Sequence, residues 1–374
     1  MAESLKTFFS KALVARIAAS IERIHPDFPS KRFVADACRG LDELELLDRA
    51  RKIADALHAH LPPRYPEAVE ILLRSLGAEH ATDELQGVGM APFFYLPHTI
   101  FVATHGLDDF ETSMRAQHEL TRRFSCEFSI RAFIGRHPDA TLKTMQRWAT
   151  DKNAHVRRLV SEGTRPRLPW ASRVPFLDAN PERVLQLLEL LKDDPASVVR
   201  RSVANHLNDL SKTAPELAFA TVKRWLKDAT PERRALVEHA MRSAIKRGDP
   251  RALGLLGFGA TPRAEITDTT FSPKRVSIGE KVRIGFTLHS TTEKPQDLVV
   301  DLVVHFVKAN GQSSPKVFKV DNVKLKAGQA QEVSKVISLA VHTTRTPYPG
   351  RHRVDAQLNG TTFPLGAFTV VEAT

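Results

Sequence analysis

The hydrophobic residues of this 374-residue chain change their spacing once, and this change constrains the fold more than any other feature. Up to about residue 260, Leu, Ile, Val and Ala recur every three to four positions, as in EAVEILLRSL, which is the period of an amphipathic helix. From about Glu265 the period is two, as in KVRIGFTLHS, which is typical of half-buried strands. We therefore expect an all-α domain over residues 1–260 and a β domain over residues 265–374, with the boundary near Gly259 to Ala264.

Three stretches of the helical part resemble one another. They are WATDKNAHVRR, LKDDPASVVRR and WLKDATPERRA, which begin at Trp148, Leu191 and Trp225. An aspartate follows each start by three residues and an arginine by nine: Asp151, Asp194 and Asp228, then Arg157, Arg200 and Arg234. The offsets of 43 and 34 residues are close to those of HEAT-type helix pairs. The pattern predicts an α-solenoid whose arginines line one wall, the alternative being chance similarity among amphipathic helices.

The β part contains six or seven short alternating segments in about 110 residues, separated by turn signals such as SIGEK, ANGQ and LNGT. This spacing predicts an antiparallel sandwich of the immunoglobulin type. The chain has two cysteines, Cys38 and Cys126, and no CxxC pair, so neither a thiolate zinc site nor a disulfide framework is indicated. The fifteen histidines show no metal-ligand spacing. We expect no metal and no organic cofactor.

Positive charge is concentrated in the middle of the helical part. The chain carries a net charge of +11, and residues 113–173 alone carry +8, whereas residues 1–260 as a whole carry +6. This distribution indicates a polyanionic partner, with nucleic acid first and an anionic membrane surface second. The N-terminal segment has charges at regular intervals, which favours an amphipathic helix over a signal peptide, and no apolar run approaches about 18 residues. We expect a cytoplasmic monomer that does not associate with membranes.

One carboxylate, Glu127, lies among arginines and phenylalanines in the stretch RRFSCEFSIRAFIGRHP. If SCEFSIRAFI forms a helix, Glu127 falls at its start, where the helix dipole favours negative charge. A structural interpretation is a salt bridge to Arg131, four residues further on. The functional interpretation is that Glu127 acts on a substrate that the arginines bind.

A second carboxylate, Glu162, ends the predicted helix VRRLVSE just before Gly163, where negative charge is mildly unfavourable. The loop that follows contains three prolines. Its candidate functional residues are Trp170 and three arginines, Arg165, Arg167 and Arg173. A stiff loop that presents cationic and aromatic side chains beside a carboxylate is typical of a functional site. The structural alternative is that Trp170 fills a gap between repeats.

These residues carry a family resemblance. The helical repeats, SCEFSIRAFI and VRRLVSEGTRPRLPWA resemble the AlkC branch of the DNA alkylation-repair glycosylases, whose AlkD relatives share the HEAT-like fold. The resemblance covers about residues 1–260, and residues 265–374 fit the immunoglobulin-like domain found in part of the AlkC group. It implies excision of N3-alkylated, positively charged bases from double-stranded DNA without a deep base-flipping pocket. It implies that Glu127 and Glu162 are the active-site carboxylates, and that Phe128, Arg158 and Trp170 contact the lesion or its strand.

The residues around these carboxylates complete a working hypothesis for DNA binding. The arginines expected to bind phosphates are Arg157, Arg158, Arg165, Arg167, Arg200 and Arg201. In the β domain, the basic stretch HTTRTPYPGRHR offers Arg345, Arg351 and Arg353 as a second DNA contact, against the alternative of a folded cap or spacer. Two other functions stay open: a non-catalytic HEAT scaffold for nucleic acid or an acidic protein, and, less favoured, a membrane-surface repeat protein.

Overall fold

A computed structural model describes residues 5–84, 89–258, 261–341 and 346–372 of the chain. Contacts divide the chain into two compact units, residues 1–240 and 241–374. The change from helix to strand falls between α15 (Pro250–Leu255) and β1 (Ala264–Ser272), where the hydrophobic spacing changes. The division between the compact units falls earlier, inside α14 (Pro231–Lys246), because the end of this helix makes its contacts with the second unit.

The first unit consists of helices. The α-helices before α14 are α1 (Lys11–Glu22), α2 (Ser30–Cys38), α3 (Leu46–His60), α4 (Tyr65–Ser75), α5 (Leu96–His105), α6 (Phe110–Thr121), α7 (Ser129–Arg136), α8 (Pro138–Trp148), α9 (Ala154–Glu162), α10 (Pro175–Ala179), α11 (Pro181–Leu191), α12 (Ser197–Thr213) and α13 (Pro215–Leu226). The 3-10 helices in the part of the chain that the structure describes are η1 (Leu5–Phe8), η2 (Leu41–Glu43) and η3 (Ala91–Tyr95). Side-chain N-caps explain where several helices begin. The side chains of Ser10, Asp109 and Asn153 accept hydrogen bonds from backbone amides in the first turns of α1, α6 and α9.

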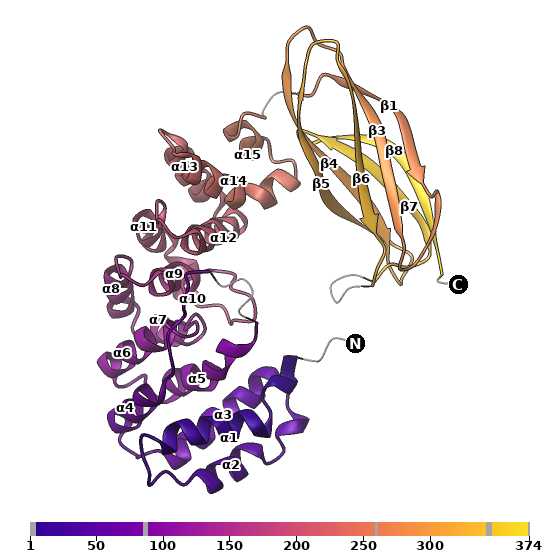
Figure 1. Cartoon of the computed structure of the whole chain (residues 1–374). Helices are drawn as coiled ribbons and strands as arrows, with labels where there is room; N and C mark the ends of the chain where they lie inside the picture. The colour runs from indigo at the N-terminus through magenta and orange to yellow at the C-terminus, as the bar shows by residue number, and fades with distance from the viewer. Residues whose placement is uncertain (1–4, 85–88, 259–260, 342–345, 373–374) are drawn as a thin grey trace. The chain divides into compact units, whose positions relative to one another are not determined.

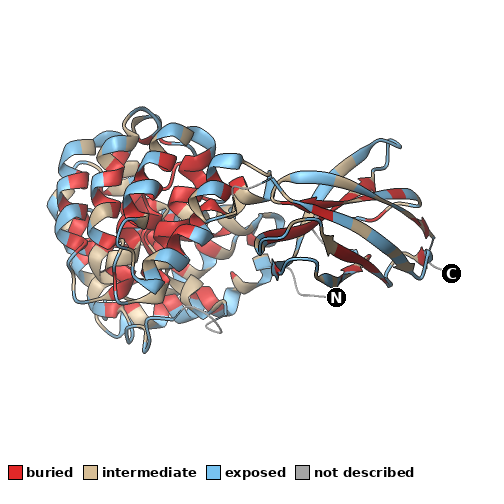
Figure 2. Cartoon of the chain, turned by 90° about the horizontal axis from the view of Figure 1, so that it is seen from above, coloured by how far each residue is buried: buried red, intermediate tan, exposed pale blue. Residues whose placement is uncertain are grey.

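From α4 onward the helices alternate between two layers (Figure 1). One layer contains α4, α6, α8, α11 and α13, and the other contains α5, α7, α9, α12 and α14. Apolar side chains from both layers fill the interior, which appears as the buried zone of this unit in Figure 2. This arrangement confirms the predicted stack of helix pairs, and it brings α7, α9 and α12, which are separated in sequence, into one layer.

The predicted Asp and Arg positions of the repeat form the turns between paired helices. Arg157 donates to the carbonyls of Asp151 and Lys152, and Arg200 donates to those of Asp194 and Pro195. Arg157 also forms a two-point ion pair with Asp194, with N–O distances of 2.6 and 2.9 Å. These arginines therefore join each turn internally, and Arg157 links it to the next repeat.

The third turn departs from this pattern. Arg233, instead of Arg234, reaches back to the preceding turn, where its Nε lies 2.6 Å from Oδ1 of Asp193. Asp228 adopts a positive φ of 55° in this turn. The sequence repeat is thus real in the first two turns and imperfect in the third.

The second unit contains the β-sandwich, whose strands are β1, β2 (Arg275–Ser277), β3 (Lys281–Ser290), β4 (Gln296–Val307), β5 (Ser313–Leu325), β6 (Ala330–Ser338), β7 (Gly350–Leu358) and β8 (Thr361–Val371). One sheet has the order β1-β3-β6 and the other β2-β8-β7-β4-β5. All pairs are antiparallel except β2 with β8, which is parallel. The predicted immunoglobulin-like sandwich is confirmed, with the three-residue β2 as an addition to the expected six or seven strands.

Alternating apolar side chains from both sheets form the core of the sandwich, including Ile284, Val300 and Phe368. The turn that follows α14 packs closely against the turn between β7 and β8. Gly248 and Gly360 both have positive φ, and a Cβ on Gly248 would lie 2.7 Å from Cα of Gly360. Only glycine fits at these two positions, because the two backbones touch.

Candidate active site

The helix α9 places three functional side chains on one face. His155, Arg158 and Glu162 are spaced at i, i+3 and i+7, which aligns them along two helical turns. The helix begins at Ala154 because the side chain of Asn153 caps it by accepting hydrogen bonds from the amides of His155 and Val156. It ends at Glu162, as the sequence predicted.

The Gly163 position allows α9 to approach α7 closely. A Cβ on Gly163 would lie 2.5 Å from Cγ2 of Ile130, a side chain of α7. A larger residue would therefore force the two helices apart. This contact brings the end of α9 next to the segment that precedes α7, where Glu127 lies.

Glu127 lies two residues before α7 (Ser129–Arg136), so the prediction that it begins the helix is displaced by about half a turn. Its Oε2 accepts hydrogen bonds from Oγ of Ser125 at 2.7 Å and from Nη1 of Arg158 at 3.2 Å. In the described part of the chain, no hydrogen bond reaches its Oε1. The predicted salt bridge to Arg131 is wrong: Arg131 points instead to backbone carbonyls of the loop after α9.

Glu162 is held from three sides in a buried setting, with 5% of its surface exposed. Its Oε1 accepts from Nη1 of Arg165 at 2.6 Å, and its Oε2 accepts from Oγ of Ser202 at 2.5 Å. Nη2 of Arg158 lies 3.7 Å from the same Oε2. Arg165 in turn donates from Nε to Oδ2 of Asp209 at 2.9 Å. Both oxygens of Glu162 are thus fixed by the protein.

The neighbouring charges control how these groups ionise. Burial raises the pKa of the Glu162 carboxyl, but the charges of Arg158 and Arg165 and the Ser202 hydrogen bond outweigh it and hold this pKa below its ordinary value. Burial lowers the pKa of Arg158, but the charges of Glu127 and Glu162 outweigh it and hold that pKa above its ordinary value. Glu162 is therefore ionised at neutral pH although it is buried.

The loop after α9 is fixed by Arg131. Its guanidinium, from α7, donates to the carbonyls of Gly163, Arg165 and Ser172 at 3.0, 2.8 and 2.9 Å. Trp170, at the tip of this loop, has a φ of 64°, which is the left-handed region, and 64% of its surface is exposed. The alternative in which Trp170 plugs a gap between repeats is therefore wrong. A strained backbone that displays an indole is typical of a functional position.

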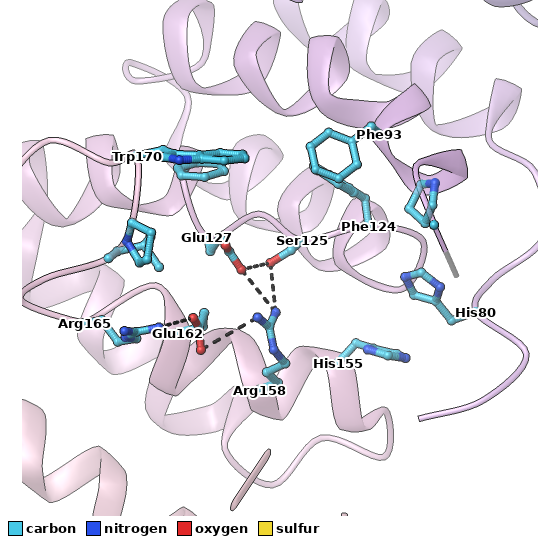
Figure 3. A pocket seen from close by; sticks show the side chains of 15 residues that line it. His80, Phe93, Phe124, Ser125, Glu127, His155, Arg158, Glu162, Arg165 and Trp170 are labelled. Atoms are coloured by element: carbon cyan, nitrogen blue, oxygen red, sulfur yellow. Dashed lines mark hydrogen bonds and ion pairs between the residues drawn. The ribbon is translucent and has the colours of Figure 1, made fainter. Parts of the chain in front are cut away.

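These side chains line one cavity of about 370 Å³. Figure 3 shows Glu127 and Glu162 both facing the guanidinium of Arg158, with Trp170 across the cavity from His155. The full lining is His80, Gly89, Pro92, Phe93, Phe124, Ser125, Glu127, Phe128, His155, Arg158, Glu162, Arg165, Leu168, Pro169 and Trp170. A cavity with apolar and aromatic walls, two carboxylates and two guanidiniums suits a cationic ring bound to a polyanionic strand.

Sequence reasoning missed several members of this cavity. The rings of His80 and His155 lie 4.4 Å apart, and burial together with the nearby His155 lowers the pKa of His80. The rings of Phe93 and Phe124 also meet, at 5.2 Å. These partners come from loops and helices far apart in sequence, and no local pattern marks them. The exception is His155, which the i, i+7 spacing from Glu162 on one helix could have marked.

The other predicted residues lie in different places. Arg167 is exposed on the loop. Arg157 is engaged in the repeat turn, and Arg200 and Arg201 line a separate hollow of about 430 Å³ with residues of α14. Arg351 and Arg353 are exposed on β7, in the second unit. Arg345 lies outside the described residues. The DNA-binding role of all of these residues stays a prediction.

Two further observations concern cofactors and membranes. Among residues 5–84, 89–258, 261–341 and 346–372, no group of three or more His, Cys, Asp or Glu side chains is arranged to hold a metal ion. None of the helices in these ranges is both long and apolar enough to cross a membrane.

Cys126 is fully buried, and burial raises the pKa of its thiol to about 12, so it stays protonated.

Known proteins resemble both units. Residues 123–247 match the family model "DNA alkylation repair enzyme", and residues 265–372 match "Uncharacterised protein YhaZ, C-terminal Ig-like domain". The chain is 34% identical to the uncharacterized protein YhaZ of Bacillus subtilis, over 95% of this chain and 96% of that protein. The solved structure of Pseudomonas fluorescens alkylpurine DNA glycosylase AlkC, bound to DNA containing an abasic site analog, matches with a TM-score of 0.90 and 37% identity, over 98% of this chain and 99% of that chain.

A HEAT-like stack that carries this cavity, followed by an Ig-like sandwich, defines a class of DNA-repair protein. The resemblance inferred from SCEFSIRAFI and VRRLVSEGTRPRLPWA is confirmed by the agreement along the whole chain. The chain belongs to the AlkC-type family of DNA alkylation-repair glycosylases.

Proposed function

We propose that this protein is a monofunctional DNA glycosylase that hydrolyses the N-glycosidic bond of positively charged N3-alkylated bases. The first substrate is 3-methyladenine, and 3-methylcytosine is the second candidate. The observation that carries the proposal is the pair of carboxylates, Glu127 and Glu162, in one cavity walled by Trp170. A protein that only bound phosphates would gain nothing from two carboxylates in its most cationic region.

The chemistry of the substrate explains why this arrangement is sufficient. N3-alkylation gives the base a formal positive charge, so the base leaves as a neutral molecule and needs little help. Breaking the bond develops positive charge on the sugar, and fixed negative charge beside the sugar stabilises that transition state. Water then attacks C1′, and its proton passes to a carboxylate or to solvent. The products are the free base and an abasic site.

The different surroundings of the two glutamates support different roles for them. Both oxygens of Glu162 are occupied by Arg165 and Ser202, so it supplies fixed negative charge. Glu127 keeps one oxygen, Oε1, without a hydrogen bond among the described residues, so it can accept one from a water molecule. We therefore assign water positioning to Glu127.

The cationic and aromatic side chains hold the DNA against these carboxylates. Phe128 and Trp170 offer ring faces to a cationic base or to the sugar edge. Since 64% of the Trp170 surface is exposed, the cavity wall is open, which supports capture of a distorted site over a deep flipping pocket. Arg167, Arg200 and Arg201 would bind phosphates, and Arg351 of the sandwich would add a second contact, whereas the predicted phosphate contact of Arg165 does not fit its burial between Glu162 and Asp209.

Product analysis tests the proposed function. Double-stranded DNA methylated with a labelled alkylating agent would be incubated with the protein, and released bases and strand breaks would be measured. We expect free 3-methyladenine above the spontaneous background, alkali-labile abasic sites and no strand cleavage by the protein itself. DNA binding with no base released above background would contradict the proposal and favour a non-catalytic scaffold.

A further inference from the structure

The glutamates belong to a longer line of alternating charges. Glu127 contacts Arg158, Arg158 faces Glu162, and Glu162 contacts Arg165. The buried part of the line ends at Asp209, whose Oδ2 accepts from Nε of Arg165 at 2.9 Å and whose Oδ1 lies 4.0 Å from the more exposed Nζ of Lys212. The last three members are 5%, 8% and 4% exposed, so solvent screens their interactions only weakly.

The helix α12 supports this line at two points. Ser202 and Asp209 are seven residues apart, so they lie on the same face of α12 two turns from each other. Ser202 donates to Glu162, and Asp209 binds the opposite edge of the Arg165 guanidinium. Among the described residues, Asp209 is therefore linked to the cavity through Arg165.

The charges of the line do not cancel. It contains three carboxylates and two guanidiniums, which leaves one net negative charge. Without Asp209, two carboxylates would face two guanidiniums, and the net charge would be zero. A cationic transition state responds to the summed field of all nearby charges, so this difference acts directly on the reaction rate.

We propose that Asp209 is a positioning residue that keeps the active site negative: it shares the charge and hydrogen bonds of Arg165, so that Arg165 orients Glu162 without neutralising it. This inference rests on the proposed glycosylase function. Asp209 does not line the cavity, and it acts through Arg165.

The other groups that face this line support the assignment. The ring of His206, also on α12, is buried and bonded to the carbonyl of Ser161, and burial lowers its pKa to about 4, so it is neutral. Arg131 faces the same loop, but its guanidinium is bound to backbone carbonyls. Nζ of Lys212 lies 4.0 Å from Oδ1 of Asp209 and is 30% exposed, so water screens its effect more strongly.

The first test combines two substitutions under single-turnover conditions with excess enzyme. Asp209→Asn should slow release of 3-methyladenine about 10- to 100-fold, because Arg165 then neutralises Glu162. Adding Arg165→Gln to Asp209→Asn restores the net negative charge, so the double variant should be faster than Asp209→Asn alone. A double variant that is as slow as Asp209→Asn, or slower, would overturn the proposal.

The pH profile separates an electrostatic role from a merely structural one. Without Asp209, the carboxyl of Glu162 loses a proton more readily, so the acid limb of the rate profile should move to lower pH. Arg165→Gln should move the limb to higher pH. Asp194→Asn is the matched control, because Asp194 is equally buried and pairs with Arg157 but contacts neither glutamate. It should leave the acid limb in place.

A binding measurement keeps the inference testable whether or not bases are released. Duplexes would carry either a protonated pyrrolidine abasic analogue or a neutral tetrahydrofuran one. Asp209→Asn should reduce the ratio of the two affinities about 10-fold, whereas Asp194→Asn should not. An unchanged ratio in Asp209→Asn overturns the role of Asp209. No base release by the wild-type protein, with a reduced ratio in the variant, would instead contradict the proposed function alone.

Discussion

The two units of the protein treat buried charge in opposite ways. The helical unit buries Arg131, Glu162, Arg165, Asp194 and Asp209, and each has an ion pair or a set of carbonyl partners. In the described part of the sandwich, Asp301 is the one buried acid, and no ion pair reaches it. The other buried side chains of the sandwich are mostly apolar, with His352, Gln357 and Thr287 as polar exceptions.

This difference shows which of the two units buries charged side chains and compensates them with partners. Burial of charges costs free energy unless every charge is compensated, so such networks persist mainly where they serve a function. In the helical unit, Glu162, Arg165 and Asp209 form such a network beside the candidate active site, whereas Asp194 joins two repeat turns. The sandwich instead has a packing core and displays its cations, such as Arg351 and Arg353, on the surface.

The largest expected effect is on catalysis in the helical unit. Glu162→Gln should slow base release about 10²- to 10³-fold, or about 2.7–4 kcal/mol, because it removes fixed charge beside the sugar. Affinity for undamaged DNA should not fall. The matched control is Glu189→Gln, because Glu189 is also ion-paired but lies on α11 outside the cavity. Equal rates for the two variants would remove the catalytic role of Glu162.

The second prediction is that a change of pH alters the folding stability of the two units with opposite sign. Burial lowers the pKa of His98 to about 4, and its ring nitrogens have no hydrogen-bond partner among the described residues. The unfolded chain binds this proton first, so stability is complete above pH 6.5 and is lost as pH falls toward 4, by on the order of 3 kcal/mol. In the sandwich, burial raises the pKa of Asp301 to about 6, against the opposing effects of Lys319 and Lys246. Its contribution is complete below about pH 3.8 and is lost as pH rises through 6.

Melting temperatures of two variants measure this contrast. His98→Phe should gain on the wild type progressively as pH is lowered from 6.5 to 4. Asp301→Asn should match the wild type near pH 4 and become more stable than it above pH 6. A constant difference across this range for either variant would contradict the assigned pKa direction.

A smaller effect concerns the strained loop. Trp170→Gly should relieve the positive φ and stabilise the protein by about 1 kcal/mol, since glycine adopts this conformation freely. The same change removes the indole from the cavity and should weaken binding to lesion-containing DNA. Thermal melting and binding assays should therefore move in opposite directions. A loss of stability together with binding would show that the indole mainly packs the fold.

The smallest effect concerns the sandwich. Arg351→Ala should reduce the slope of log K against log salt by about 0.9, the value for one phosphate contact. Lys326→Ala is the control: strand register places Lys326, next to Leu325 opposite Gln296, at the end of the sheet away from Arg351. Equal slopes for both variants and the wild type would leave the sandwich as a spacer.

Some of this structure was available from local sequence, and the reasons are physical. The change of hydrophobic period near residue 260 follows from the geometry of helices and strands, so it predicted both fold classes. The Pro- and Arg-rich loop predicted an exposed Trp170. Glu127 and Glu162 were recognisable because their charge is unusual in a basic region.

The partners of these residues could not be read from the sequence. Ser202 and Asp209 reach Glu162 and Arg165 across 40 and 44 residues, and only the stacking of α9 on α12 brings them together. Arg157 looked like a phosphate-binding residue because its charge is visible in sequence, whereas its pairing with Asp194 in the next repeat is not. Pairing between repeats is decided by packing, so charge counting alone does not show which arginines remain available to DNA.

The central claim is that Glu127 and Glu162 hold negative charge against the sugar of the bound strand. The most direct measurement is the affinity of the wild type and of the Glu127→Gln/Glu162→Gln double variant for duplexes with a cationic pyrrolidine or a neutral tetrahydrofuran abasic analogue. We expect the wild type to prefer the cation about 10-fold or more, and the double variant to lose this preference while still binding the neutral duplex. Equal preference in both proteins would contradict the account.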